Sequence, residues 1–444
     1  MESGIKISII LPSLNVAAYI EECITSAINQ TLKEIEIICV DAGSEDGTYE
    51  ILKGYAERDE RVQLINSDVR SYGAQVNIGL QKSHGKYIAI LETDDYARAD
   101  MYEKLYIVAE KTNVDYVKGD YTSFYTMDNG ERFFEEIKQF YDEPNLYGRV
   151  INPHKEDILY RWDAGLWRGI YNRDFLQRNN IWFNETPGAA YQDISFKEKV
   201  LFMAKSAYYV EDHLYFYRTD REDASQYSLQ SLYNSWIEFL LLNEWENIRG
   251  DIFYEKGHFI YMVIVFVREY HNTIIRCDYD EHRKECEHYY WWFSHKIRFA
   301  FDRGIISMED FTEDTFEELS LILHDLDSYK RYLKEKISLI DSVLSRQLEQ
   351  KKEIVIYGSG HQGKMIAKYL NAKGRFGDIV SFADNSSEKQ GRTIVGIQVT
   401  SLEDSIEKYP NADFVIANEK YTDEMEEQYI FAGGERERLI RIWG

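Results

Sequence analysis

The stretch IAILETDDYA, residues 88–97, begins with apolar and small residues and ends in three carboxylates, those of Glu92, Asp94 and Asp95. Carboxylates are among the side chains that are least often buried, so the pattern predicts a core strand whose last residues leave the core. Continuously apolar strands are typical of parallel sheets that are covered on both faces. Ligands of such sheets bind at the carboxyl ends of the strands, which makes this strand end a candidate site.

Short apolar runs alternate with longer helical patterns through the first third of the chain. This alternation predicts an α/β layer with a largely parallel sheet. Polar clusters follow three of the strands, at residues 12–15, 41–46 and 92–95, and we expect these clusters to meet at one edge of the sheet. The predicted strands are KISIILPS (6–13), EIEIICVDAG (34–43), RVQLINS (61–67), KYIAILETDD (86–95) and VDYVKGDYTSF (114–124).

Length and charge restrict the class of protein. At 444 residues the chain exceeds one ordinary core, so we expect two or three domains. The formal net charge of −25 repels nucleic-acid backbones, so no nucleic-acid partner is predicted. The N-terminus lacks the pattern of a signal peptide, and the longest apolar run, at residues 259–267, is too short to cross a bilayer. We expect a cytoplasmic protein, with the inner face of the cell membrane as the alternative location.

The sequence pattern changes twice along the chain. The α/β pattern covers residues 1–225, a helical pattern rich in aromatic and charged residues covers 226–350, and strand–helix alternation returns in 351–444. The helical region carries no catalytic motif and ends in a long polar stretch that predicts a connector helix. Its segment HYYWWFSHKIRFAF, residues 288–301, mixes aromatic and basic side chains. We expect these aromatic side chains to fill the helical core, with a peripheral membrane contact as the alternative.

The acidic strand end suits one kind of chemistry. Adjacent carboxylates repel each other, and their ionised forms need a cation or a network of donors. Mg²⁺ takes oxygen ligands and often bridges one or two carboxylates to substrate phosphates. A metal ion held in this way neutralises a diphosphate leaving group. The alternative for Glu92, Asp94 and Asp95 is a solvated turn that precedes a helix.

Three stretches, taken together and in order, resemble the family 2 glycosyltransferases of the GT-A fold. The resemblance covers about residues 5–225 and implies the nucleotide-diphospho-sugar transferase fold, in which helices flank a mostly parallel sheet. The matching stretches are ISIILPSLNVAAYIEECITSAINQTLKEIEIICVDAGSEDGTYEIL (7–52), GAQVNIGLQKSHGKYIAILETDD (73–95), and WRGIYNRDFLQRNNIWFNE (167–185) with YQDISF (191–196).

The resemblance also implies roles for individual residues. Asp193 would be the general base that deprotonates an acceptor hydroxyl. Asp94, with Asp95 as the second choice, would hold Mn²⁺ or Mg²⁺ as the cofactor. Taken alone, Asp41 equally suits a turn and Asp193 equally suits a helix cap. The residues implied to bind the donor nucleotide are Pro12, Ser13, Asn15, Asp41, Gly73, Asn77 and Glu92.

This sequence departs from the family pattern at several positions. Glu92 stands where the metal-binding motif usually begins with Asp, and Gln192 stands where an acid usually precedes the base. Leu14, Ala42 and Val76 also differ from the usual residues, and all three lie on the nucleotide side. The identity of the nucleotide base therefore stays open.

A glycine turn lies near the C-terminus. Gly358, Gly360 and Gly363 in YGSGHQGKM have the spacing of a dinucleotide-binding turn, and Asp384 follows at the end of the next predicted strand. The segment resembles the small Rossmann-like domain at the N-terminus of bacterial sugar O- and N-acyltransferases, which implies a nucleotide sugar as the ligand rather than NAD. The alternative is a glycine turn that serves strand–helix packing and binds no ligand.

Together these residues predict a metal-dependent, inverting glycosyltransferase of the hexosyl or a related class. It would move a sugar from a nucleoside diphosphate sugar to a hydroxyl of a glycan or lipid-linked glycan, and the resemblance implies surface polysaccharide biosynthesis. Two other functions remain open: a non-catalytic nucleotide-sugar-binding or scaffold protein, and an NAD(P)-dependent oxidoreductase that uses the C-terminal turn.

Overall fold

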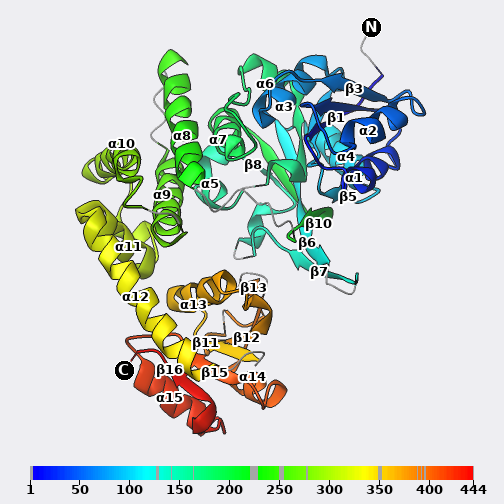
Figure 1. Cartoon of the computed structure of the whole chain (residues 1–444). Coiled ribbons are helices and arrows are strands. Elements are labelled where there is room, and N and C mark those ends of the chain that lie inside the picture. Colours follow the sequence, from blue (N-terminus) through cyan, green and yellow to red (C-terminus); the bar gives the residue numbers. More distant parts are fainter. Residues whose placement is uncertain are drawn as a thin grey trace. The chain divides into compact units, whose positions relative to one another are not determined.

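The chain divides into two compact units, Met1–Thr312 and Glu313–Gly444 (Figure 1). The predicted boundaries at residues 225 and 350 stay a prediction, and the helical region between them contributes helices to both units. The computed structural model describes residues 4–126, 130–141, 143–163, 165–220, 229–249, 255–276, 279–348, 353–387, 389–391, 393–394 and 397–443.

A mostly parallel sheet forms the centre of the first unit. Its strand order is β3-β2-β1-β4-β9-β6-β10-β5, with β7 beside β6 and β8 beside β10. β9 and β5 run antiparallel to their neighbours, whereas β1, β2, β3 and β4 are parallel. The strands are β1 (Ile7–Ser13), β2 (Ile35–Asp41), β3 (Val62–Asn66), β4 (Tyr87–Ile90), β5 (Tyr96–Ala97), β6 (Tyr116–Thr126), β7 (Arg132–Ile137), β8 (Val150–Ile151), β9 (Gly169–Asn172) and β10 (Ala207–Arg218).

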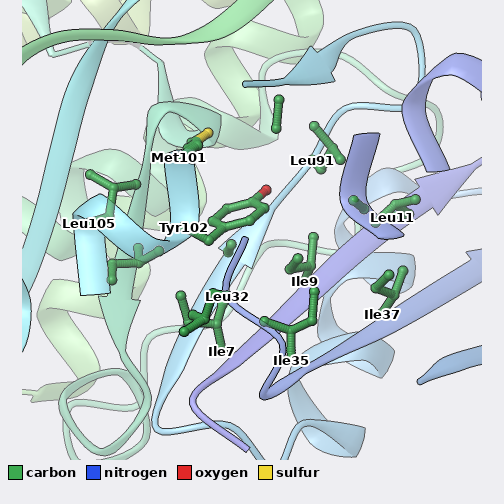
Figure 2. Close-up of a cluster of buried hydrophobic side chains, with 14 of the residues drawn as sticks. Ile7, Ile9, Leu11, Leu32, Ile35, Ile37, Leu91, Met101, Tyr102 and Leu105 are labelled. Carbon is green, nitrogen blue, oxygen red and sulfur yellow. The ribbon is translucent and has the colours of Figure 1, made fainter. Parts of the chain in front are cut away.

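Helices cover both faces of this sheet, which is why β1, β2 and β4 are buried along their whole length and mostly apolar. On one face, α1 (Ile20–Ile28) and α4 (Met101–Thr112) pack on alternate strand residues. Figure 2 shows the Tyr102 ring of α4 directed toward Ile9 of β1. On the other face, α3 (Tyr72–Lys82) lies so close to β1 that a Cβ atom on Gly79 would meet the Ile10 side chain at 2.5 Å. The predicted α/β fold is therefore confirmed.

The remaining helices of the first unit lie between strands in the sequence, except α8, α9 and α10, which follow the last strand of the sheet. Among them, α8 packs on both α7 and α9, and α10 contacts α8 and α9. Within the described residues, no helix is both long and apolar enough to cross a membrane. The cellular location stays a prediction. These helices are α2 (Thr48–Ala56), α5 (Ile158–Trp162), α6 (Arg173–Arg178), α7 (Gln192–Met203), α8 (Leu229–Arg249), α9 (Lys256–Arg276) and α10 (Arg283–Asp302).

The second unit is built around a small parallel sheet, with β11 at its centre and β12 and β15 on either side. Chain order along the sheet reverses at β11, which is the doubly wound arrangement. The long helix α12 packs Ile340 and Leu344 into the same core as Ile354 and Ile356 of β11. The elements are α11 (Glu313–His324), α12 (Leu326–Gln347), β11 (Ile354–Tyr357), α13 (His361–Ala372), β12 (Ile379–Ala383), β13 (Thr393–Ile394), β14 (Ile397–Thr400), α14 (Leu402–Lys408), β15 (Asp413–Ile416), α15 (Thr422–Phe431) and β16 (Leu439–Arg441).

Candidate functional site

The ends of β1, β2 and β4 meet at one edge of the large sheet, as the sequence predicts. Ser13 is paired with Asp41 at the last register position of β1 and β2. The hydroxyl of Thr93, which follows β4, donates to the carbonyl oxygen of Pro12 at 3.0 Å. The three polar clusters therefore form one continuous surface at the carboxyl ends of the strands.

The loops after β1 and β2 are held together by their own polar groups. Asp41 is buried, and its Oδ1 accepts hydrogen bonds from the amides of Gly43 and Ser44, each at 3.0 Å. Its Oδ2 accepts from the Ser44 hydroxyl at 2.5 Å. Asn15, at a positive φ of 52°, accepts from the amide of Glu45 at 2.9 Å. The side chain of Asp41 therefore stabilises the turn after β2. Its contact with a donor nucleoside stays a prediction.

Gly73 and Asn77 fasten α3 to the segment at residues 183–185. A Cβ atom on Gly73 would lie 2.0 Å from the carbonyl oxygen of Asn184, so only glycine fits there. The Asn77 side chain accepts from the amide of Phe183 and donates to the carbonyl oxygen of Phe183 and to Glu185 Oε1, each at 3.0 Å. Both residues thus position the helix that lines the strand ends, and no contact with a nucleotide is needed to explain them.

Replacing Gly73 by alanine is expected to destabilise the first unit. The new Cβ atom would collide with backbone, and overpacking of this kind costs about 1–3 kcal/mol of the free energy of unfolding. Gly54→Ala, in the last turn of α2, is the matched control, because the nearest atom to its Cβ is the flexible end of Arg58 at 3.2 Å. Thermal unfolding followed by circular dichroism should show a lower Tm for the first variant only. Equal Tm values would contradict the steric argument.

The three acids after β4 have different surroundings. Glu92 Oε1 accepts a hydrogen bond from the Tyr72 hydroxyl at 2.6 Å. Asp95 is 2% exposed, and its two oxygens accept from the Tyr215 hydroxyl at 2.8 Å and from the Arg218 amide at 2.7 Å. Burial, together with the charges of the two neighbouring acids, raises the pKa of Asp95 well above its usual range. Asp94 is only partly buried.

This arrangement suits a metal ion that is held by few protein ligands. In the part of the chain that the structure describes, no three His, Cys, Asp or Glu side chains converge on one point. Mg²⁺ keeps several waters and needs only one or two carboxylates when substrate phosphates complete its shell. Asp94 fits this requirement because it is partly exposed, whereas Asp95 is buried and bonded through both oxygens to Tyr215 and Arg218. The assignment of the metal to Asp94 and Asp95 stays a prediction, with Asp94 as the better ligand.

Asp193 lies in the first turn of α7, two residues after the N-cap position. The N-cap residue is Tyr191, with a φ of 71°, and its own side chain accepts no capping hydrogen bond. Burial raises the pKa of the Asp193 carboxyl, while the positive charges of Lys197 and Arg268 oppose this rise. Burial is the main cause of the raised pKa of Tyr72, and the negative charges of Glu92 and Asp193 raise it further. Tyr72 therefore lies near both acids and links the start of α7 to the acidic strand end.

Comparison with known proteins identifies this part of the chain. Residues 8–188 match the family described as glycosyl transferase family 2. We call these residues the family 2 domain, after the family that they match. The chain is 31% identical over 216 residues to the uncharacterized glycosyltransferase EpsJ of Bacillus subtilis, a match that spans 48% of this chain and 60% of EpsJ. It is 28% identical to glycosyltransferase GlyG of Streptococcus pneumoniae over 48% of this chain and 70% of GlyG.

A solved structure shares the fold of the family 2 domain. TarS 1–349 from S. aureus, in complex with UDP-GlcNAc, matches 75% of this chain and 92% of that structure with a TM-score of 0.55 and 17% identity. This likeness confirms the GT-A fold. The predicted resemblance of the C-terminal segment to sugar acyltransferases stays a prediction.

Two cations that the sequence analysis did not select lie near Asp193. Lys197, one turn further along α7, donates to the Tyr160 carbonyl oxygen at 2.8 Å. Arg268, on α9, donates to Glu269 Oε1 at 2.8 Å, and the Tyr191 hydroxyl donates to the same oxygen at 3.0 Å. The helical region, which carries no motif in its sequence, thus supplies a charge beside the predicted base of the family 2 domain.

An aromatic stack supports the acidic strand end of the family 2 domain. The Trp167 ring stacks on Tyr215 at 4.2 Å and on Tyr217 at 5.1 Å between ring centroids. Tyr215 is the residue whose hydroxyl holds Asp95. Trp167 belongs to the WRG segment, one of the stretches that carry the family resemblance. Its stacking partners on β10 lie almost fifty residues later, and no local sequence pattern predicts the contact.

The C-terminal glycine turn has a structural explanation at two of its three glycines. Gly358 has a φ of 109°, and a Cβ atom on Gly363 would lie 2.1 Å from the carbonyl oxygen of Gly358. A Cβ atom on Gly360 would meet no atom within 4 Å. Asp384 Oδ2 accepts from the amide of Ser359 at 2.9 Å and from its hydroxyl at 2.5 Å, which ties the turn to the end of β12. The packing alternative thus explains Gly358, Gly363 and Asp384, and a ligand at this turn stays a prediction.

Proposed function

We propose that the chain is a metal-dependent, inverting glycosyltransferase that moves a sugar from a nucleoside diphosphate sugar to a hydroxyl of a glycan or lipid-linked glycan. One observation carries the proposal: Tyr72 lies near both a partly exposed carboxylate with a raised pKa, Asp193, and the acidic end of β4, within the family 2 domain. A base for the acceptor and a carboxylate for the diphosphate side are the two groups that single displacement requires.

The chemistry follows from the roles of these two acids. Asp193 accepts the proton of the acceptor hydroxyl, and its raised pKa makes it a stronger base than an exposed carboxylate. The acceptor oxygen then forms a bond to the anomeric carbon while the bond from that carbon to the diphosphate oxygen breaks, so the configuration inverts. Mn²⁺ or Mg²⁺ bound through Asp94 would supply Lewis-acid stabilisation of the diphosphate charge.

The surroundings of the strand ends support a nucleotide-sugar donor. The loops after β1 and β2 are rigidly bonded to each other through Asn15, Ser44 and Glu45, so the surface beside the acids is preorganised. The solved structure that shares the fold binds UDP-GlcNAc. A UDP-sugar is therefore the first donor to test, with a role in surface polysaccharide biosynthesis as the wider proposal.

A nucleotide-release assay tests this function. The full chain is incubated with UDP-, GDP-, dTDP- and CDP-sugars, with Mn²⁺ or with EDTA, and the freed nucleotide is detected. Release from one donor that EDTA abolishes is the expected result. Release that EDTA does not change would remove the metal from the proposal. No binding of any donor would favour a non-catalytic scaffold protein instead.

The charge of Arg268 is expected to set the lower pH limit of activity. This charge opposes the burial that raises the pKa of Asp193, so Arg268→Gln should raise that pKa further. The base must be unprotonated to act, so the acidic limb of the pH profile of kcat/KM should move to higher pH. Arg178→Gln, at an exposed position on α6, is the control and should leave the profile unchanged. If the acidic limb of the pH profile does not move in Arg268→Gln, the charge of Arg268 does not affect the pKa of the base.

A further inference from the structure

A cavity of about 740 Å³ lies among α8, α9 and α10, in the helical region and away from the residues of the strand ends. This volume is within the range of pockets that hold small organic ligands. Its walls combine aromatic rings with amide, imidazole and carboxylate groups. The comparisons and the proposed reaction assign no role to these residues.

The polar end of the cavity contains an unsatisfied carboxylate. Glu246, on α8, is 9% exposed, and no group in the described residues donates a hydrogen bond to its Oε1. The two basic side chains that face it have other partners. His258 contacts Glu198 at 3.0 Å through Nδ1, and Lys296 donates to Asn243 Oδ1. A buried acceptor without a donor costs free energy, so a ligand that brings a donor to this oxygen would be favoured.

Burial raises the pKa of Glu246 to about 6, and the charges of His258 and Lys296 oppose this rise. The carboxylate is therefore mostly ionised at neutral pH and accepts hydrogen bonds. In this form Glu246 has no proton to donate, so the hydrogen bond that its Oε1 lacks must come from another group.

The mouth of the cavity carries exposed indole rings. Trp291 is 66% exposed although it lines the cavity, and Trp292 is partly buried beside it. Large aromatic side chains at a rim offer flat apolar surfaces with little conformational entropy to lose on binding. Phe239 and Phe259 continue the apolar surface inward.

The charges select among the classes of ligand that this cavity could hold. A phosphate or nucleotide would meet the carboxylate of Glu246, and an alkyl chain would leave that carboxylate without a donor. A cation would meet the ammonium group of Lys296, which already lies 5.8 Å from the centre of the Trp292 ring. An uncharged ring with several hydroxyl groups avoids all three costs, because it offers a C–H face to the indoles and O–H donors to Glu246.

We propose that this cavity is a saccharide-binding site, in which a sugar unit packs on Trp291 and Trp292 and donates a hydroxyl hydrogen bond to Glu246. The neighbouring amides of Asn243 and Asn247 are suited to bond further hydroxyls. This inference goes beyond the proposed reaction, because the sugar is bound here and is not transformed.

The test is saturation-transfer NMR on the full chain, with no donor present. The probes are glucose, galactose, N-acetylglucosamine, N-acetylgalactosamine and rhamnose, followed by the β-linked disaccharides of those that bind. At least one sugar is expected to bind the wild-type chain. Trp291→Ala and Glu246→Gln should each weaken that binding at least fivefold. Trp162→Ala removes a similarly exposed tryptophan outside the cavity and should bind as the wild type does.

Two results would overturn the saccharide site: none of the sugars binds the wild-type chain, or both cavity variants bind as tightly as it does. Trp291 is mostly exposed, so its replacement should leave the fold intact even if Glu246→Gln does not. Because no donor is present, the outcome is independent of whether the chain transfers a sugar.

Discussion

Asp193→Asn is expected to abolish sugar transfer while the fold and the donor affinity are kept. Asparagine has nearly the same size as aspartate, but its amide cannot take a proton from the acceptor hydroxyl. General-base catalysis contributes about 10²–10⁴-fold to a rate, so kcat should fall by a factor in that range. The position on α7 faces the acceptor in the proposed reaction, so the affinity for the nucleoside diphosphate should change little.

The fold should survive this substitution because Lys197, the nearest buried cation, has other acidic partners. Glu198 and Asp163 both favour its charged form, and each has a larger effect than Asp193. The measurements are initial rates with saturating donor, donor binding by calorimetry, and Tm. Asp174→Asn is the matched control, since Asp174 also lies in the first turn of a helix but is exposed.

Two outcomes would contradict the role of Asp193. A variant that transfers sugar within tenfold of the wild-type rate would place the base elsewhere. A variant that loses donor binding to the same extent as kcat would make Asp193 a donor-binding residue. Unchanged rates in Asp174→Asn are needed in either case to exclude a general effect of removing one negative charge.

The acidic end of β4 could be predicted from the sequence because two local rules conflict there. Ile88 to Ile90 follow the pattern of a buried strand, and carboxylates avoid burial, so the chain must reach an edge at Glu92. The parallel order of β1, β2 and β4 then brings the other polar clusters to the same edge. Fold class and site location thus depend on patterns within a few residues.

The roles of individual polar residues could not be predicted, because their partners are far away in the sequence. Asp95 is held by Tyr215, which lies 120 residues later, and Asn77 is held by Phe183, which lies 106 residues later. Gln75, which donates to the carbonyl oxygens of Ser13 and Val40, had no sequence signal except its place on a buried helix face. Long-range hydrogen bonds of this kind decide whether a polar residue of a motif supports the backbone or can bind a ligand.

The helical region shows the same limit of sequence reasoning. Its pattern predicts helices and an aromatic core, but among the aromatic residues of 288–301 only Phe293 is fully buried and Trp291 is exposed. Arg268 differs from the other basic residues of these helices only through its place beside α7, which the periodicity does not encode. The exposed Trp291 and the unsatisfied Glu246 likewise become visible only when α8, α9 and α10 are packed together.

Asp94→Ala is expected to abolish metal-dependent nucleotide release without a large loss of stability. Stabilisation of the leaving group by a metal is worth several kcal/mol, and each 1.36 kcal/mol is tenfold in rate, so the rate should fall by about 100-fold or more. Asp94 is partly exposed, so its truncation should leave Tm within a few degrees of the wild type.

Asp95→Asn is the comparison variant. We expect the substitution at Asp94 to weaken metal binding and the substitution at Asp95 to lower stability. One of the two oxygens of Asp95 becomes an NH₂ group, which cannot accept from the Arg218 amide or the Tyr215 hydroxyl. A lost buried hydrogen bond costs about 1–3 kcal/mol, so this variant should show the lower Tm of the two. Calorimetric titration of Mn²⁺ in the presence of UDP should show weakened binding mainly in Asp94→Ala. If Asp95→Asn alone lost the metal, the cation would belong to the buried acid, and the hydrogen bonds of Asp95 would have to be exchanged for coordination.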